Sequence, residues 1–419
     1  MGQAEEIEAR LRSRTLDGLP AGKAVIPDYL QYSICAVPGL VRTLFDGPGG
    51  AESPVYAAIA SAVQGRVDRV ILLVIDGLGF YHLASLLKRF PDLYLHSLVE
   101  RGALVPITSV FPSTTVSALT TFSTGLTPQE HGMVGYRLYL RETSAITNMI
   151  RLSLLGSTKG DSAVDWGIDL ETFLAGPRLS ESLRRLGVES HVVLPRRISS
   201  SGLSHLLYGA TDQLHPSTNL SDMLVAARRA VQRATGKAFV YLYWSETDSI
   251  AHARGPESEE STAELRSVDA ALGRELGEAC GAVLMITSDH GFVTMERQDY
   301  ARIDEDPLLM RDLVLPPVGE PRASYLFVRE GRRRAVADRI AERFAGDLVC
   351  LDSHEALERG LFGRGDVHAA VPDRIGDLVV ASTGRKGLYY PFPDSVMLQG
   401  MHGGLTKEEM LVPLIVSRL

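Results

Sequence analysis

Aspartate and histidine residues recur where long apolar segments of this chain end. One aspartate follows the run RVILLVI, an Asp-x-x-x-His pattern comes shortly after AFVYLYW, and an Asp-His pair follows AVLMITS. A further histidine, set among glycines, precedes the last apolar run. Carboxylate oxygens and imidazole nitrogens without cysteine form a ligand set suited to zinc or manganese. The residues in this context are Asp76, Asp248, His252, Asp289, His290 and His402.

Each of these side chains, taken alone, has an ordinary structural explanation. An aspartate at a strand end commonly caps the next helix, and a lone histidine commonly makes a surface hydrogen bond. The whole set is harder to explain in this way, because three separate apolar segments carry it. Two metal ions about 3.5–4 Å apart can hold a phosphoryl group from both sides, so the set favours metal-assisted phosphoryl chemistry.

Three apolar segments must position these ligands. Arg69–Asp76, Ala238–Trp244 and Ala282–Thr287 are continuous runs of leucine, β-branched and aromatic residues. Such runs are typical of parallel strands that are buried on both faces. Since the C-terminal ends of parallel strands lie along one edge of a sheet, we expect the ligands to gather there.

A hydroxyl-rich segment, Thr108–Tyr136, would reach the same edge. Thr114 and Thr115 stand at the start of a predicted helix in which apolar residues recur every third position from Val116, and Gly125 ends it. Unpaired backbone N–H groups and the helix dipole favour an anion at such a start. Helix starts rich in serine and threonine usually serve only as caps, so a catalytic hydroxyl and a simple cap both remain open here.

The remaining pattern alternates strands with helices. We expect residues 198–209, which begin ISSSG, to form a surface loop, and residues 292–370 to form a small α/β insertion. Further strands are predicted at 104–110, 377–381 and 411–416, and helices at 53–63, 81–89, 179–186, 223–234, 259–279 and 331–344.

Composition excludes several classes of protein. The 419 residues are 45% hydrophobic and 22% charged, which is ordinary for a soluble globular protein. The net charge of −8 argues against nucleic acid as the main partner. The N-terminal segment has no apolar region typical of a secretory signal, and no run approaches the roughly 18 apolar residues of a membrane span. Cys35, Cys280 and Cys350 form no CxxC pair, so we expect a reducing, cytoplasmic location.

Five motifs carry a resemblance to a known family. VILLVIDGLG, FPSTT…STGLTPQEHG, ETDSIAHARGP, ITSDHGF and MHGG occur in this order between residues 70 and 404. Together they resemble the alkaline phosphatase superfamily, and within it the type I phosphodiesterase/nucleotide pyrophosphatase branch, which also holds phosphonoacetate hydrolase. The resemblance implies a three-layer α/β sandwich, with a mostly parallel central sheet, helices on both faces and a small inserted cap. We therefore expect an N-terminal arm over 1–50, a catalytic core over 51–291 and 371–419, and the cap over 292–370.

The resemblance also assigns roles to the residues. It implies two divalent metal ions, with zinc expected and manganese as the alternative. One ion would be held by Asp76, Asp289, His290 and the nucleophile's oxygen, and the other by Asp248, His252 and His402. In such enzymes the nucleophile lies nine residues before the threonine of the Thr-Gly pair that closes its helix. Counting back from Thr124 gives Thr115, with Thr114 as the alternative.

One position departs from the family pattern. Relatives that cleave nucleotides usually read His-Gly-x-x-x-Asn after this block, and the asparagine amide holds a phosphate oxygen. Here His131-Gly132 is followed by Tyr136 at the asparagine position. The Tyr136 hydroxyl or the N–H groups at the helix start would have to replace that donor. We expect Tyr136, Phe111 and Ser113 to contact substrate.

The resemblance implies a metal-dependent phosphoryl hydrolase, most directly a phosphodiesterase or nucleotide pyrophosphatase that acts on a small phosphate ester or nucleotide-like substrate through a phospho-threonine intermediate. The alternatives are a phosphomonoesterase, a phosphonate (C–P) hydrolase and a non-catalytic protein that binds metal and phosphate. A monoesterase needs an extra positive group, for which Arg137 and Arg141 are candidates. A sulfatase is disfavoured, since Thr115 does not begin a Cys/Ser-x-Pro-x-Arg motif. The sequence does not predict the oligomeric state.

Overall fold

The computed structural model describes residues 2–277 and 281–419. Cys280 and the end of the helix predicted over 259–279 lie outside the described residues. Cys35 and Cys350 are free thiols. In the described ranges, no helix combines the length and apolar character needed to cross a membrane.

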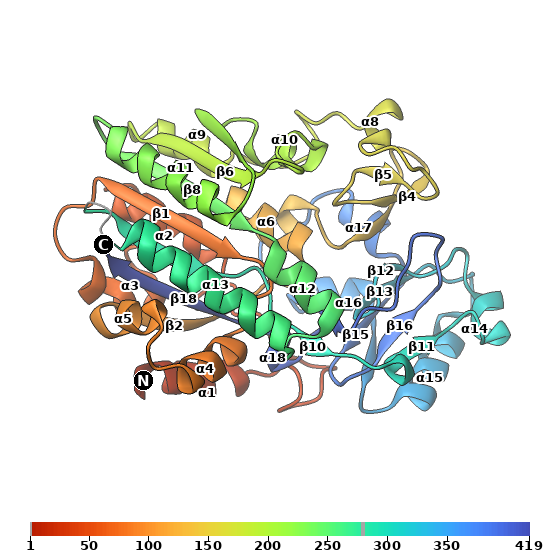
Figure 1. Cartoon of the computed structure of the whole chain (residues 1–419). Coiled ribbons are helices and arrows are strands. Elements are labelled where there is room, and N and C mark those ends of the chain that lie inside the picture. Colours follow the sequence, from red (N-terminus) through yellow and green to blue (C-terminus); the bar gives the residue numbers. More distant parts are fainter. Residues whose placement is uncertain (1, 278–280) are drawn as a thin grey trace.

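A seven-stranded sheet forms the centre of the fold, in the order β2-β18-β9-β1-β8-β6-β7. β1 is parallel to both β8 and β9, and β6 is parallel to β7 and β8, while β18 runs antiparallel to β2 and β9. The mostly parallel sheet predicted from the apolar runs is therefore confirmed (Figure 1). The strands are β1 (Arg69–Ile75), β2 (Ala103–Thr108), β6 (Glu189–Pro195), β7 (Gln213–Ser217), β8 (Ala238–Trp244), β9 (Val283–Thr287) and β18 (Leu411–Arg418).

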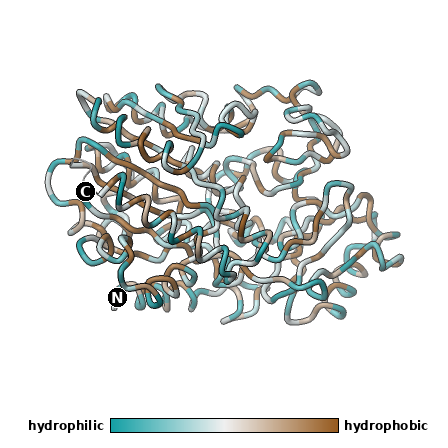
Figure 2. Tube along the Cα trace, in the orientation of Figure 1, coloured by the Kyte–Doolittle hydropathy of each residue, from teal (hydrophilic) through white to brown (hydrophobic). Residues whose placement is uncertain are grey.

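Helices cover both faces of this sheet because its strands are apolar on both sides. In β1, Val70, Leu72 and Val74 join one buried cluster, whereas the alternate residues Ile71 and Leu73 join another. The hydropathy-coloured trace shows long hydrophobic stretches along the central strands (Figure 2). The first face carries α1 (Gly2–Arg12), α2 (Ala36–Leu44), α3 (Pro54–Ile59), α6 (Thr115–Thr124), α9 (Leu179–Arg184) and α10 (Gly202–Tyr208). The second carries α4 (Phe80–Arg89), α5 (Tyr94–Arg101), α11 (Leu220–Arg233) and α13 (Glu259–Leu276).

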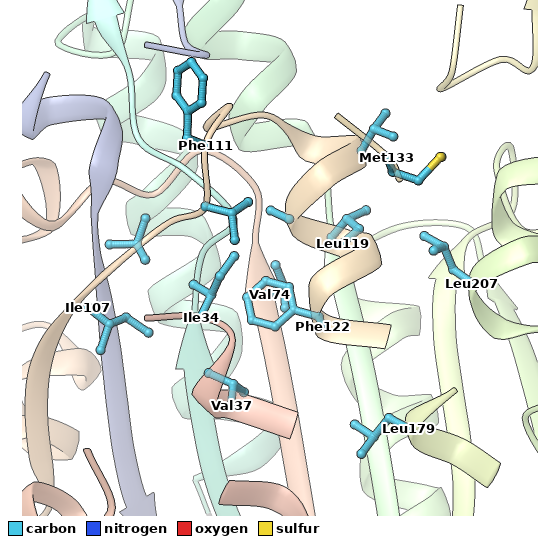
Figure 3. Packing of buried hydrophobic residues seen from close by; sticks show 14 of the residues in the cluster. Ile34, Val37, Val74, Ile107, Phe111, Leu119, Phe122, Met133, Leu179 and Leu207 are labelled. Atoms are coloured by element: carbon cyan, nitrogen blue, oxygen red, sulfur yellow. The ribbon is translucent and has the colours of Figure 1, made fainter. Parts of the chain in front are cut away.

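Helix α6 is enclosed on most of its surface. Residues 115–123 are all buried. Leu119 and Phe122 lie in one cluster with Ile34 and Val37 from the N-terminal arm and Leu207 from α10 (Figure 3). Packing on several sides fixes the start of α6, where the two candidate hydroxyls stand.

The expectation that residues 198–209 form a surface loop is wrong. Gly202–Tyr208 is helix α10, and Ser201 caps it by accepting a hydrogen bond from the Ser204 N–H. Leu203, Leu206 and Leu207 are buried against the core. The run ISSSG contains a helix cap rather than a loop, and the apolar spacing that follows it is that of a one-sided helix.

A second seven-stranded sheet stands beside the first, in the order β14-β15-β13-β12-β3-β4-β5. This sheet contains strands that precede residue 292 and a strand that follows residue 370, as well as strands between them. The division into a core over 51–291 and 371–419 and a cap over 292–370 stays a prediction. The strands of the second sheet are β3 (Arg137–Leu140), β4 (Ala145–Asn148), β5 (Ser153–Leu154), β12 (Val318–Glu320), β13 (Ala323–Leu326), β14 (Leu348–Asp352) and β15 (Leu378–Ser382). The nearby helices are α14 (Pro307–Asp312), α15 (Arg333–Phe344), α16 (Ser353–Glu358) and α17 (Val371–Ile375).

Short elements complete the described chain. They are α7 (Pro128–His131), α8 (Ser162–Asp165), α12 (Glu246–Arg254) and α18 (Lys407–Met410), the 3-10 turns Ala60–Val63 and Arg297–Asp299, and the paired strands β10 (Val293–Thr294) with β17 (Gly400–Met401) and β11 (Tyr300–Arg302) with β16 (Gly387–Tyr389).

A fully buried ion pair joins the two sheets. The Arg322 guanidinium, in the turn between β12 and β13, donates to both carboxylate oxygens of Glu409 in α18, at 2.5 and 2.8 Å. Both side chains have no exposed surface. The Glu409 carboxylate also accepts from the Gly404 N–H at 2.8 Å, the Thr406 hydroxyl at 2.7 Å and the Thr406 N–H at 3.3 Å. The pair therefore supports the loop that carries His402.

Replacing Arg322 by methionine should lower the free energy of unfolding by about 3–5 kcal/mol, because Glu409 would stay buried without its cation. The matched control is Arg66→Met, which removes an arginine from an exposed pair with Asp68 and should leave stability almost unchanged. Urea unfolding of the three proteins checks this. Equal losses in the two variants would show that the buried pair contributes no more than a surface pair.

Candidate active site

Asp76 directly follows β1, at the edge where the parallel strands end. Its Oδ2 accepts a hydrogen bond from the Tyr243 hydroxyl, and its backbone carbonyl accepts one from the Thr247 hydroxyl at 2.6 Å. Burial, and then the charge of Asp76, raise the pKa of Tyr243 well above its usual value, so this phenol stays a neutral donor. The other carboxylate oxygen of Asp76, Oδ1, is buried with no hydrogen-bond partner.

Asp289 and His290 follow β9, the neighbour of β1 in the sheet. Asp289 is anchored through Oδ1, which accepts from the N–H groups of Gly77 at 3.1 Å and His290 at 3.0 Å. Its Oδ2 is buried without a partner and lies 3.5 Å from His290 Nε2. The same nitrogen is 3.4 Å from Asp76 Oδ1. The predicted convergence of these two strand ends is therefore present.

Asp248 and His252 lie one turn apart on α12, which begins just after β8. Spacing of four residues puts both side chains on one face of the helix. Asp248 Oδ1 is 3.4 Å from His252 Nε2 and 4.0 Å from His402 Nε2, and it also lacks a hydrogen-bond partner. His402, just after β17, reaches the site from the C-terminal part of the chain.

Each of the three imidazoles is oriented by a backbone carbonyl. His252 Nδ1 lies 2.7 Å from the Gly400 oxygen, His402 Nδ1 lies 3.0 Å from the Ser113 oxygen, and His290 Nδ1 lies 3.1 Å from the Gly291 oxygen. Since a carbonyl only accepts, Nδ1 carries the proton in each ring and the Nε2 lone pair faces the site. This is the arrangement that metal-binding histidines use.

The charges at this edge favour a cation. Burial, and then the charges of Asp248 and Asp289, raise the pKa of Asp76 well above its usual value. Burial likewise raises the pKa of Asp248. Burial, and then His290 and His252, lower the pKa of His402 well below its usual value, which keeps it neutral and able to bind metal. Three buried carboxylate oxygens without partners, next to imidazole nitrogens, fit divalent metal ions.

The ligand atoms fall into two overlapping groups, each within 4.8 Å. Asp76, Asp289 and His290 form the first, as predicted. The second consists of Asp248, His290 and His402, where the prediction had His252 in place of His290. His252 Nε2 lies 3.4 Å from Asp248 Oδ1, so His252 is next to the second group. The structure therefore brings all six predicted side chains together.

Thr115 stands beside the first group. It is the first residue of α6, and its Oγ1 lies 3.2 Å from His290 Nε2. Thr114 is the N-cap residue and lines the same cavity. The contact with a ligand nitrogen favours Thr115 over Thr114 as the reactive hydroxyl.

A cavity of about 370 Å³ opens over Thr115. Tyr136 lines this cavity, and its contact with substrate stays a prediction. Phe111 is fully buried among the core residues (Figure 3). It packs edge-on against Phe362, with ring centres 5.2 Å apart. The Ser113 hydroxyl donates to the Gly404 carbonyl at 2.8 Å. These placements argue against direct substrate contacts by Phe111 and Ser113. Their positions instead hold the α6 loop against the core and the His402 loop.

Sequence reasoning missed two polar residues near this cavity. Glu320, at the end of the three-residue strand β12, is buried 3.6 Å from His402 Nδ1, and burial raises the pKa of Glu320 to about 8. Asn148, at the end of β4, donates from Nδ2 to the Tyr136 hydroxyl at 2.8 Å. Neither stands in a motif, and both reach the site through strand pairing in the second sheet.

The comparisons with known proteins agree with this geometry. The model of the type I phosphodiesterase/nucleotide pyrophosphatase family matches residues 70–405. No curated protein matches the chain significantly.

Several solved structures share the fold. Murine ectonucleotide pyrophosphatase/phosphodiesterase 5, as an inactive threonine-to-alanine variant in complex with AMP, has a TM-score of 0.63 at 19% identity, over 83% of this chain and 87% of that chain. Its human counterpart has a TM-score of 0.63 at 16% identity, over 83% and 87%. Phosphonoacetate hydrolase from Sinorhizobium meliloti 1021, in complex with phosphonoformate, has a TM-score of 0.63 at 20% identity, over 83% and 89%.

The family model spans most of the chain, including every strand-end ligand described above. The protein therefore belongs to the type I phosphodiesterase/nucleotide pyrophosphatase family, metal-dependent hydrolases of the alkaline phosphatase superfamily.

Proposed function

We propose that this protein hydrolyses a small phosphate ester, with a phosphodiester or nucleotide-type pyrophosphate as the first candidate, through a covalent intermediate on Thr115. The observation that carries the proposal is the position of the Thr115 hydroxyl, 3.2 Å from His290 Nε2 and within the cavity walls. A threonine hydroxyl is a weak nucleophile near neutral pH, so its surroundings must activate it.

Two divalent metal ions, zinc or alternatively manganese, would supply that activation and neutralise charge on the phosphoryl group. Asp76, Asp289, His290 and Thr115 would hold one ion, and Asp248, His252 and His402 the other. The unpartnered oxygens of the three aspartates support this assignment.

Thr115 and the backbone at the start of α6 would carry out the remaining steps of the reaction. Thr115 Oγ1 loses its proton to solvent and forms a bond to phosphorus as the bond to the leaving oxygen breaks. The start of α6 orients backbone N–H groups towards the phosphoryl oxygens. Water next cleaves the phospho-threonine, which restores Thr115 and releases the phosphoryl product, so that one water molecule is consumed in each cycle.

One of the structural neighbours supports this proposal. The murine protein was captured with AMP as an inactive variant in which a threonine is replaced by alanine. That combination is what a nucleophilic threonine in a nucleotide-binding enzyme would give.

Phosphonate hydrolysis is the second candidate. Phosphonoacetate hydrolase matches this fold as well as the nucleotide-type enzymes do, and Tyr136 stands where nucleotide-cleaving relatives usually have asparagine. Release of inorganic phosphate from phosphonoacetate, measured beside hydrolysis of bis(para-nitrophenyl) phosphate, separates the two activities.

Thr115→Val should lower turnover of bis(para-nitrophenyl) phosphate by at least about a thousandfold, because it removes the attacking oxygen and leaves the shape of the side chain. Bound metal, measured by mass spectrometry, should remain. Thr120→Val is the matched control, since Thr120 is a buried threonine of the same helix that donates only to the Val116 carbonyl. Undiminished activity in Thr115→Val would reject this nucleophile.

Removing metal should also destabilise the fold, because buried carboxylates would again face one another. After chelation, zinc at a hundredfold excess over its dissociation constant should raise the free energy of unfolding by about 2.7 kcal/mol. Thermal unfolding with zinc, manganese and magnesium measures this without relying on activity. Asp289→Asn should weaken the response. A melting temperature that ignores every metal would contradict the proposed metal site.

A further inference from the structure

Arg137 is a buried cation in the wall of the catalytic cavity. It opens β3, and its side chain is only 10% exposed. It lines the cavity that contains Thr115 and also a neighbouring cavity of about 240 Å³. A buried guanidinium is unfavourable unless its charge and N–H groups are matched, so its position calls for an explanation.

The guanidinium contacts two aromatic rings but is incompletely paired. Its central carbon lies 4.8 Å from the ring centre of Tyr136 and 5.0 Å from that of Phe392. One terminal nitrogen donates to Asp394 Oδ1 at 2.9 Å, while Nε is buried with no hydrogen-bond partner. Asp394 is 43% exposed, so this counter-ion is accessible to solvent. The two cation–π contacts hold the guanidinium in place without using its N–H donors, which can therefore change acceptor.

Arg137 and Arg141 differ in their surroundings, and only Arg137 is buried at the catalytic cavity. Both were candidates for a positive group that would contact substrate. Arg141 is 79% exposed and pairs with Asp373. Within the described part of the chain, Arg137 is the only arginine or lysine that lines the catalytic cavity. The adjoining cavity adds Arg151 to its walls, so positive charge continues away from the reacting centre.

We propose that Arg137 determines substrate specificity by binding a second anionic group of the substrate, which takes the place of Asp394. This rests on the phosphoryl hydrolase proposed above and deepens it. The shared chemistry is a cluster of anionic oxygens in addition to the single charge of a simple diester. It could be the extra charge of a monoester, or a carboxylate or phosphate carried on a substituent that extends towards the Arg151 cavity.

Matched chromogenic esters test the proposal. Carboxyethyl para-nitrophenyl phosphate differs from the ethyl ester by one carboxylate, and para-nitrophenyl phosphate differs from its methyl ester by the monoester charge. Arg137→Gln should lower kcat/KM about 10- to 100-fold for the member of one pair that carries the extra charge, and less than about threefold for its partner. The pair that responds identifies the source of the anion.

Three further variants sharpen the result. Arg137→Lys should keep part of the preference, because it keeps the charge but loses the planar donor pair. Asp394→Asn should increase the preference by removing the competing carboxylate. Arg141→Gln should match the wild type. Equal losses for both members of each pair in Arg137→Gln, or the same shift in Arg141→Gln, would overturn the proposal. If Arg137→Gln does not fold, Arg137→Lys and Asp394→Asn decide.

Binding without turnover separates this proposal from the proposed function. Calorimetry compares phosphonopropionate with propylphosphonate, which lacks the carboxylate, on the wild type and the Arg137 variants. Carboxylate-dependent binding that is lost in Arg137→Gln, with no ester hydrolysed by the wild type, would reject the hydrolase and keep the anion site. Thr115-dependent hydrolysis with no charge preference in any pair would keep the hydrolase and reject the role of Arg137.

Discussion

Mutual repulsion among buried carboxylates is the constraint on which this structure depends. Asp76, Asp248 and Asp289 each direct one unpartnered oxygen into the same small volume. At an effective dielectric constant of about 20, two unit charges 4 Å apart interact with about 4 kcal/mol, which is a large share of the stability of a typical domain. Such a cluster persists only on a rigid scaffold and is relieved by a bound cation. The same repulsion that strains the protein therefore creates its affinity for metal.

The scaffold holds these side chains in place through the atoms that face away from the proposed metal site. Strands β1 and β9 are paired in register from Val70 to Val74, so Asp76 and Asp289 leave the sheet side by side. The Tyr243 hydroxyl and the Gly77 N–H then hold the outer oxygens of the two carboxylates. His402 instead follows the two-residue strand β17, which pairs with β10 and lies outside the central sheet. The buried pair of Arg322 and Glu409 supports the loop after it. The second sheet thus contributes to the metal site as well as to the cavity.

The sequence predicted the central sheet and its candidate ligands because each is marked by residues that are adjacent in the sequence. An apolar run shows a buried strand, and the aspartate or histidine that follows it must emerge at the sheet edge. The second sheet was predicted only in part. A strand was expected at 377–381, where β15 lies, but β3, β4, β5 and β12 were missed because they are short and pair across the chain, as in the contact between Gly319 and Arg137. Glu320 and Asn148 depend on those pairings. Phe111 was misjudged for a related reason, since an aromatic side chain near a reactive loop can face the core or the cavity.

Selectivity must come from the cavity wall, because the proposed metal ions would attract any phosphoryl oxygen. The wall is built by the second sheet and the segment that carries Phe392 and Asp394. Within it, Tyr136 accepts a hydrogen bond from Asn148, whose own oxygen is occupied by the N–H groups of Ile150 and Arg151. The amide is fixed in this orientation, so the single proton of the Tyr136 hydroxyl is directed to another acceptor. A phenol oriented in this way supplies one donor where an asparagine amide would supply two, and it does so from a bulkier ring. The departure at position 136 therefore changes both the shape of the cavity and the number of its donors, while the metal ligands stay the same.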